Sequence, residues 1–161
     1  MQVTDRSFSW YDVPAEVKDL LVLAAKNWDN TTESEKYINE ALAKTTDTEV
    51  LVTAYRYFVY KYKYPQALQV VEKVINNIKD AEKFPDDWEE LKPILLSRSQ
   101  DPQVRLFLNA YAASGFVLAK MGELEKAKEA TARVKEVDAK NEFGASIILD
   151  ILTRPPEEEE D

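Results

Sequence analysis

The sequence predicts an all-α protein built from antiparallel helix pairs, and three observations support this class. Hydrophobic residues make up 45% and charged residues 32% of the 161 positions, with only three glycines, which is typical of helix-rich domains. Helix start signals recur along the chain, and a short pattern in residues 64–71 returns in residues 124–131. A chain of this length can bury its own core, so we expect a single helical domain over residues 1–153.

Start signals place the expected helices in chain order. Thr32 and Thr46 each precede a glutamate by three residues, as in capping boxes, and Asp101 followed by Pro102 favours a helix start. Pro93 falls inside one expected helix and predicts a kink there unless the helix begins later. The expected helices cover residues 14–28, 32–44, 47–62, 65–82, 86–97, 102–120, 123–137 and 141–152.

Residues 55–64 fit this scheme least well. Aromatic and basic side chains alternate there at every second position, which locally favours a β-strand. The length of the surrounding segment and the helix start at Tyr64-Pro65 favour a helix instead. We therefore predict a helix and keep the strand as the alternative.

Residues 105–141 carry the most informative pattern. Small residues stand at Gly115 and Ala127, a turn is expected at Gly122, and large apolar residues occupy Tyr111, Leu118, Leu124 and Val137. This pattern resembles one repeat of the tetratricopeptide-repeat family, an antiparallel helix pair that stacks on copies of itself. The resemblance implies degenerate repeats stacked in a short right-handed solenoid.

An insertion is expected between two of these repeats. Ala67 corresponds to Ala127, and the two lie 60 residues apart. One such repeat has about 34 residues, so this spacing exceeds one repeat by about 26 residues. We therefore expect residues 82–101 to form an insertion with one extra helix. The helix at 141–152 would then cap the stack.

The resemblance also implies where a partner would bind. Members of the family bind peptides or protein segments on the concave face formed by the first helix of each pair. Projecting this face onto the chain selects Val52, Arg56, Val59, Tyr60, Asn109, Phe116 and Lys120. Asp19 and Leu23 stand where members that clamp a terminal carboxylate have Lys and Asn, so we expect an apolar or helical segment as the partner.

Two features, one on this concave face and one in the last helix, each allow two interpretations. Arg56 and Tyr60 lie four residues apart on one helix, where they can make a cation–π contact. They either form a recognition patch for a partner or only support their own partly exposed helix. The last helix is apolar nearly all round, at Ile148, Ile151 and Leu152 among others. A second protomer could cover it, which makes a homo-oligomeric assembly subunit the alternative function, or the insertion could fold back over it.

Composition removes several other classes. The chain has no Cys and no His, which excludes disulfides, zinc sites built on those residues, and Ser-His or Cys-His catalytic pairs. The acidic cluster around Trp88 is typical of a helix start. We therefore expect no enzyme, no metal and no cofactor.

Charge and hydropathy narrow the expected cellular location and the class of binding partner. The net charge is −9, and five acidic residues lie in the tail at 154–161, which we expect to be disordered. An acidic body argues against binding nucleic acid. No stretch approaches the roughly 20 apolar residues of a membrane span. We expect a cytoplasmic protein with a protein or peptide partner.

Overall fold

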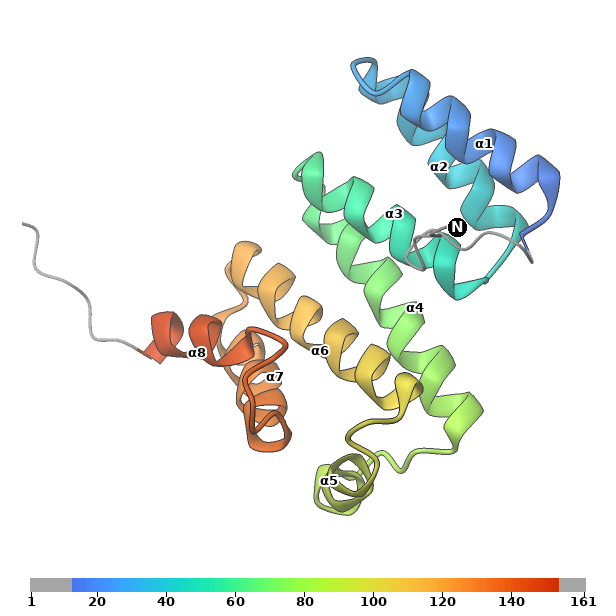
Figure 1. Ribbon diagram of the computed structural model, residues 1–161. Coiled ribbons are helices and arrows are strands. Elements are labelled where there is room, and N and C mark those ends of the chain that lie inside the picture. Colours follow the sequence, from blue (N-terminus) through green and yellow to red (C-terminus); the bar gives the residue numbers. More distant parts are fainter. Residues whose placement is uncertain (1–12, 154–161) are drawn as a thin grey trace, which may run out of the picture. The chain divides into compact units, whose positions relative to one another are not determined.

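The computed structural model describes residues 13–153, and these residues form eight helices (Figure 1). The predicted all-α class with packed antiparallel helix pairs is confirmed, and each predicted helix is present within a few residues of its expected bounds. The chain divides into two compact units, unit 1 up to Val70 and unit 2 from Val71. The helices are α1 Ala15–Lys26, α2 Thr31–Lys44, α3 Thr48–Tyr60, α4 Tyr64–Glu82, α5 Trp88–Ser97, α6 Pro102–Lys120, α7 Leu124–Val137 and α8 Ala145–Thr153.

Unit 1 contains α1, α2, α3 and the first turns of α4. Helices α1 and α2 form an antiparallel pair, and α3 packs next to α2. The pair forms because each helix has one apolar stripe that needs cover. The stripe residues that are buried are Val17, Leu20, Leu21 and Ala24 of α1, Ile38 and Ala41 of α2, and Val50, Leu51, Ala54, Tyr57 and Phe58 of α3.

The two predicted capping boxes are wrong by one or two residues. Helix α2 is capped by Asn30, whose side chain accepts a hydrogen bond from Glu33 N at 3.2 Å, rather than by Thr32. Helix α3 is capped by Asp47, which accepts from Glu49 N at 2.9 Å, rather than by Thr46. Asn and Asp are better N-caps than Thr, so the neighbouring stronger residue takes the position in both cases. The predicted cap at Asp101 is confirmed, with Gln103 N donating at 2.8 Å.

Residues 55–64 are helical up to Tyr60 and then make a tight turn into α4, so the strand alternative is wrong. Tyr62 in this turn has a φ of 59°. Lys63 N donates to Phe58 O and Tyr62 N to Val59 O, at 2.8 and 3.0 Å. This hydrogen-bond pattern is a Schellman motif, which normally places glycine at the residue with positive φ.

In unit 2, α6 and α7 form an antiparallel pair with an unusually close crossing. A Cβ atom added to Gly115 of α6 would lie 2.6 Å from Thr131 Cγ2 and 3.7 Å from the Ala127 carbonyl oxygen. Ala127 and Thr131 are fully buried. Gly115 and Ala127, the two small residues of the repeat-like pattern, therefore lie where the two helices cross closely.

The turn between α6 and α7 has the same hydrogen bonds as the turn between α3 and α4. Glu123 N donates to Leu118 O and Gly122 N to Ala119 O, at 2.9 and 3.1 Å. Gly122 has a φ of 81° and occupies the position equivalent to Tyr62. One turn geometry therefore recurs with the 60-residue spacing that separates Ala67 from Ala127.

Helix α5 lies between α4 and α6 in the chain and packs against α7. It buries Trp88, Leu91 and Leu95 and continues through Pro93 to Ser97. Arg98, at its end, donates to Glu82 Oε1 at 2.6 Å and to Asp101 Oδ2 at 2.7 Å. These bonds tie the end of α4 to the start of α6, so the intervening segment is held at both ends.

Helix α8 packs against α7 and α6. Ala112, Val134 and Ala145 form the core where the three helices meet, with Phe143 packed against it. The Asp138 carboxylate shapes the preceding loop, because its two oxygens accept from Glu142 N at 2.8 Å and Phe143 N at 2.9 Å.

The acidic tail at 154–161 lies outside the described residues. No helix within residues 13–153 is long and apolar enough to cross a membrane.

Candidate functional site

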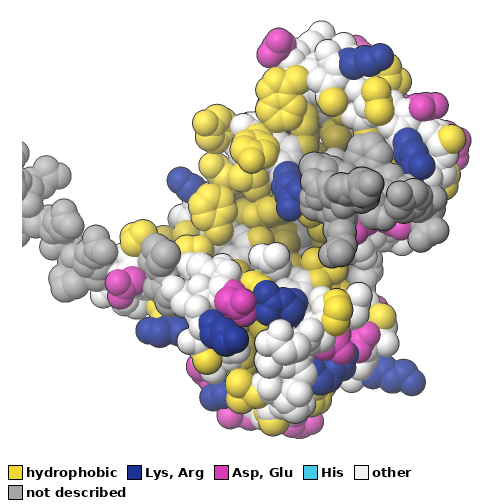
Figure 2. All heavy atoms as spheres, viewed as in Figure 1, with side chains coloured by type: hydrophobic (Ala, Val, Ile, Leu, Met, Phe, Trp, Pro, Cys, Tyr) yellow, Lys and Arg dark blue, Asp and Glu magenta, His cyan; other side chains and the backbone are white. Residues whose placement is uncertain are grey.

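Unit 1 has a mostly apolar hollow of about 330 Å³ on its surface. Buried residues of α1, α2 and α3 form its base: Leu21, Ala24, Ile38 and Tyr57. More exposed residues form its rim: Ala25, Trp28, Thr53, Arg56 and Tyr60. We call this feature the unit-1 hollow. Figure 2 shows hydrophobic side chains gathered over this part of α1 and α3.

Trp28 is held at the rim by three contacts. Its ring meets Tyr57 edge-on at 5.6 Å between centroids and Tyr60 at 6.4 Å. Lys61 Nζ lies 4.1 Å from the centroid of the Trp28 ring and donates to the Trp28 carbonyl oxygen at 2.5 Å. Such aromatic and cation–π contacts fix the ring while leaving 40% of Trp28 exposed.

The base of the hollow is fixed from below. Ser34 Oγ of α2 and Tyr57 OH of α3 share a buried hydrogen bond of 2.5 Å. Lys63 Nζ and Glu35 Oε1, 2.8 Å apart, join the start of α4 to α2, and this raises the pKa of Lys63. The Tyr57 ring is therefore held in one orientation at the base of the hollow, as expected of a preformed binding surface.

Arg56 supplies the charge of the unit-1 hollow. Among the residues that the structure describes, its guanidinium makes no ion pair, and none of the residues lining the hollow is acidic. Burial and then the nearby Asp47 raise the pKa of Glu49, an effect that the Arg56 charge opposes. The hollow thus combines an apolar base with one cation free to meet an anion.

The structure brings together two of the four predicted groove residues in unit 1. Arg56 and Tyr60 both line the unit-1 hollow, and 69% of Tyr60 is exposed. Val52 and Val59 are half-buried on α3 and are not among its lining residues. Trp28 and Leu21 complete the site and were missed. The tryptophan lies just after α1, where the resemblance names no contact residue.

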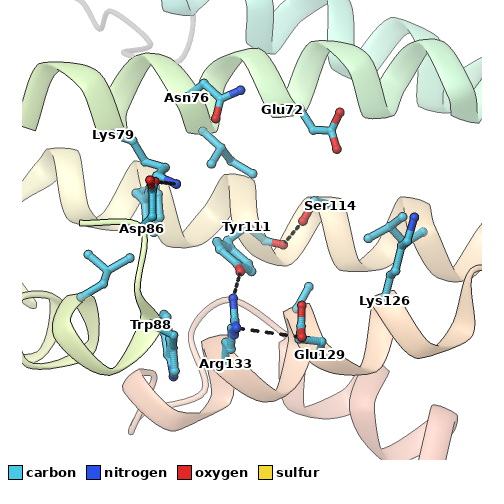
Figure 3. A pocket seen from close by; sticks show the side chains of 15 residues that line it. Glu72, Asn76, Lys79, Asp86, Trp88, Tyr111, Ser114, Lys126, Glu129 and Arg133 are labelled. Carbon is cyan, nitrogen blue, oxygen red and sulfur yellow. Dashed lines mark hydrogen bonds and ion pairs between the residues drawn. The ribbon is translucent and has the colours of Figure 1, made fainter. Parts of the chain in front are cut away.

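Unit 2 has a larger groove of about 570 Å³ (Figure 3), which we call the unit-2 groove. Helices α4 and α7 form its two walls, α6 forms its base, and α5 together with Asp86 closes one end. Its lining residues are Glu72, Ile75, Asn76, Lys79, Asp86, Trp88, Leu91, Phe107, Tyr111, Ser114, Leu118, Lys126, Glu129, Ala130 and Arg133.

Aromatic rings and Arg133 organise the closed end. Arg133 donates to Tyr111 OH at 3.1 Å, and its guanidinium lies 5.4 Å from the centroid of the Trp88 ring. Trp88 and Tyr111 lie 6.4 Å apart. The hydrogen bond to Tyr111 is the main cause of the raised pKa of Arg133. Figure 3 shows Arg133 reaching from α7 toward Tyr111 on α6.

Ion pairs neutralise most charges at this end. Lys79 and Asp86 are 2.8 Å apart, and this contact lowers the pKa of Asp86. Outside the groove lining, Lys92 and Glu136 pair at 2.7 Å, which lowers the pKa of Glu136 and ties α5 to α7. These carboxylates are committed to lysines, an arrangement that suits structure rather than acid–base catalysis.

The predicted groove residues of unit 2 lie on the other side of α6. At about 100° of rotation per residue, Asn109, Phe116 and Lys120 point roughly opposite to the residues that α6 contributes to the groove. Asn109 and Lys120 are exposed, and Lys120 Nζ lies 5.6 Å from the centroid of the half-buried Phe116 ring. Sequence reasoning missed the unit-2 groove because its lining comes from four separate segments of the chain.

The predicted oligomer contact lies on α8. Ile151 is 58% exposed, while Ile148 and Leu152 are half-buried. The helix packs against α7 and α6 and buries Ala145. Within the described part of the chain, no group of three or more acidic residues is arranged to hold a metal ion.

Comparison with known proteins gives one distant relative. The chain is 26% identical over 156 residues to a protein of Azotobacter chroococcum mcd 1 that is described as an uncharacterized 19.8 kDa protein in the nifW 5′ region. The match covers 94% of this chain and 88% of that protein. No family model matches the chain. No solved structure is significantly similar to it.

Proposed function

We propose that this protein is a non-catalytic, tetratricopeptide-like interaction module that binds a segment of another protein in the unit-1 hollow. The observation that carries the proposal is the pairing of an exposed aromatic, apolar hollow with Arg56, a cation that makes no ion pair with any residue the structure describes. Aromatic residues and Arg are the types that contribute most to protein interfaces. Exposed apolar hollows with a few polar groups mark binding sites.

The chemistry of the hollow defines the segment that it would take. Leu21, Ile38 and Tyr57 offer room for one apolar side chain, and Trp28 and Tyr60 flank it. Arg56 at the rim suits a carboxylate one or two residues away on the same segment, since a guanidinium forms bidentate hydrogen bonds with carboxylates. The partner is therefore a segment with an apolar anchor beside an Asp or Glu.

Features of both units support the tetratricopeptide-like arrangement. The same Schellman turn closes α3 and α6, and a buried alanine follows each turn five residues after the position with positive φ, at Ala67 and Ala127. In a solenoid built from such pairs, α5 would be an inserted helix and α8 a closing one. This arrangement makes α1, α3 and α6 the first helices of three pairs.

A display selection with random linear peptides tests the hollow. Peptides retained by the wild-type chain are measured again on Arg56→Glu and on Lys73→Glu, which changes the same charge at an exposed position of unit 2. We expect an apolar residue next to an acid in the enriched peptides. Affinity should fall at least about tenfold, or about 1.4 kcal/mol, for Arg56→Glu alone. Equal affinity for both variants would overturn the proposal.

A second candidate function is an assembly subunit that associates with itself through α8. The observation in its favour is Ile151, a large apolar side chain 58% exposed beside the half-buried Ile148 and Leu152. Light scattering after size exclusion tests it. A mass above the monomer that returns to the monomer in Ile151→Asp supports the idea, and a monomer at tens of micromolar wild-type protein rejects it.

A further inference from the structure

We infer that the unit-2 groove is a second binding site, which takes an amphipathic helical segment of another protein. It is separate from the unit-1 hollow and does not depend on it. It also lies on the side of α6 away from Asn109, Phe116 and Lys120, which the resemblance selects as the binding face. Its volume of about 570 Å³ falls within the range of ligand-binding pockets.

The length of the groove fits a short helix. Its base consists of Phe107, Tyr111, Ser114 and Leu118, which follow one another on α6 at steps of three and four residues. The eleven residue steps of helix between Phe107 and Leu118 span about 16 Å, or about three turns. A segment that presents apolar side chains at positions i, i+4 and i+7 would cover this base along its length.

Backbone hydrogen bonding favours a helical ligand over an extended one. The walls and base of the groove are helices, whose backbone N–H and C=O groups are already paired within each helix. An extended segment lying on Phe107, Tyr111 and Leu118 would find no backbone partner there, and unpaired buried polar groups are costly. A helical segment satisfies its own backbone and so avoids this cost.

Charges at the open end define the flanks of the ligand. Glu72 on α4 and Lys126 on α7 lie on opposite walls, away from the Lys79–Asp86 pair (Figure 3). Within the described residues Glu72 makes no ion pair, and Lys126 has only an exposed contact of 3.9 Å with Glu123. A helix lying in the groove can direct side chains toward both walls at the same position along its axis. An extended chain instead directs successive side chains alternately toward the base and toward solvent. The ligand should carry a base on the α4 side and an acid on the α7 side.

The rest of the groove is preformed and needs no rearrangement. Arg133 is held by Tyr111, by the Trp88 ring and by a longer contact of 3.9 Å with Glu129. Trp88 donates to Glu136 Oε1 at 3.4 Å, which anchors the ring from outside the groove. A fixed groove saves the ordering cost that weakens binding to mobile surfaces.

The test uses a displayed library of helical peptides. Each peptide has about 16 residues, an alanine-rich host, fixed leucines at i, i+4 and i+7, and Lys, Glu or Gln randomised on both flanks. The full-length protein is the target, and fluorescence anisotropy measures the affinity of the enriched peptides. We expect enrichment of a base on one flank and an acid on the other.

A charge exchange in the protein provides the matched control. In the double variant Glu72→Lys with Lys126→Glu both changes are at exposed sites, so folding is retained. Affinity for the selected peptide should fall at least about tenfold and should return for a peptide with exchanged flank charges. Arg56→Glu in unit 1 should change nothing.

Three results would overturn the inference. The first is the absence of any enriched peptide. The second is enrichment that the charge exchange leaves unaffected or that Arg56→Glu abolishes, which would assign the binding to another surface. The third is a parallel selection in which peptides with a central proline bind as well as helical ones, which would point to an extended ligand.

Discussion

Gly115 and Thr131 hold the α6–α7 pair at its closest point, where a Cβ on the glycine would come within 2.6 Å of the threonine Cγ2. We predict that Gly115→Ala destabilises the protein by up to about 2 kcal/mol. Overpacking costs about 1–3 kcal/mol, and the better helix propensity of Ala returns about 1 kcal/mol of that. Chemical denaturation measures the change in the free energy of unfolding.

The same glycine substitution should behave differently once the threonine methyl is gone. Thr131→Ser removes Cγ2 but keeps the hydroxyl that donates to the Ala127 carbonyl oxygen at 2.8 Å. In this background Gly115→Ala should be neutral or stabilising. An equal cost in both backgrounds would show that the Gly115–Thr131 contact does not limit the approach of the helices.

Tyr62 and Gly122 allow a reciprocal test of the repeated turn. A residue with a side chain costs roughly 1–2 kcal/mol in the left-handed conformation, and glycine costs unfolded-state entropy instead. Tyr62→Gly should therefore stabilise the protein by about 0.5–1 kcal/mol, and Gly122→Ala should destabilise it by about 1 kcal/mol. A Cβ on Gly122 meets no atom within 4 Å, so the second value reports on the backbone alone. Thermal or urea unfolding in which both changes have the same sign would refute this view of the turn.

Asp138 should be needed for the docking of α8. Both of its carboxylate oxygens accept backbone N–H groups, and the side chain is only 8% exposed. We expect Asp138→Ala to cost about 1–3 kcal/mol, because it leaves two donors without their partner. Asp138→Asn keeps one acceptor and should cost less. Hydrogen exchange should show faster exchange at the Glu142 and Phe143 amides, and unchanged protection there would contradict the role assigned to Asp138.

Low pH should weaken the packing of α5 against α7, because it protonates Glu136 of the Lys92–Glu136 ion pair. The hydrogen bond from Lys92 holds the pKa of Glu136 below its ordinary value, so the folded state binds fewer protons than the unfolded state in this range. The stability that the pair contributes is present above about pH 4.3, the ordinary pKa of Glu, and is lost as pH falls through the lowered folded-state value. In a Trp10→Phe, Trp28→Phe background the fluorescence of Trp88 reports on this contact.

We expect the Trp88 emission to shift to the red as pH falls below about 4.3. Glu136→Gln removes the titrating group, so the same variant background with this change should show a smaller shift over that range. An unchanged pH profile in Glu136→Gln would assign the transition to other carboxylates, such as Asp101 beside Arg98, whose pKa is also lowered.

The helices could be predicted from sequence because their signals are local. Apolar spacing, Pro102 after Asp101, and Gly122 at a turn act within a few residues of the helix ends that they define. The caps were predicted at Thr32 and Thr46, but Asn30, two residues before Thr32, and Asp47, one residue after Thr46, are stronger N-caps and take this role. Each of these errors moves a helix start by one or two residues.

The sites could be predicted only in part because they depend on which faces meet. Arg56 and Tyr60 were found since they share one helix face, but Trp28 joins them from the end of α1 through packing that no local pattern encodes. The unit-2 groove brings Trp88, Tyr111 and Arg133 together from three helices. Its position follows from where α5 packs, and the spacing of residues on α6 does not contain that information.

Two exposed tyrosines two residues apart give the most direct test of the central claim, that the unit-1 hollow binds a protein segment. Tyr60 lines the hollow, and Tyr62, 78% exposed, does not. Calorimetric titration with a peptide selected on the wild-type chain should show affinity reduced at least about tenfold by Tyr60→Ala and unchanged by Tyr62→Gly. Equal affinities for the two variants would contradict the claim.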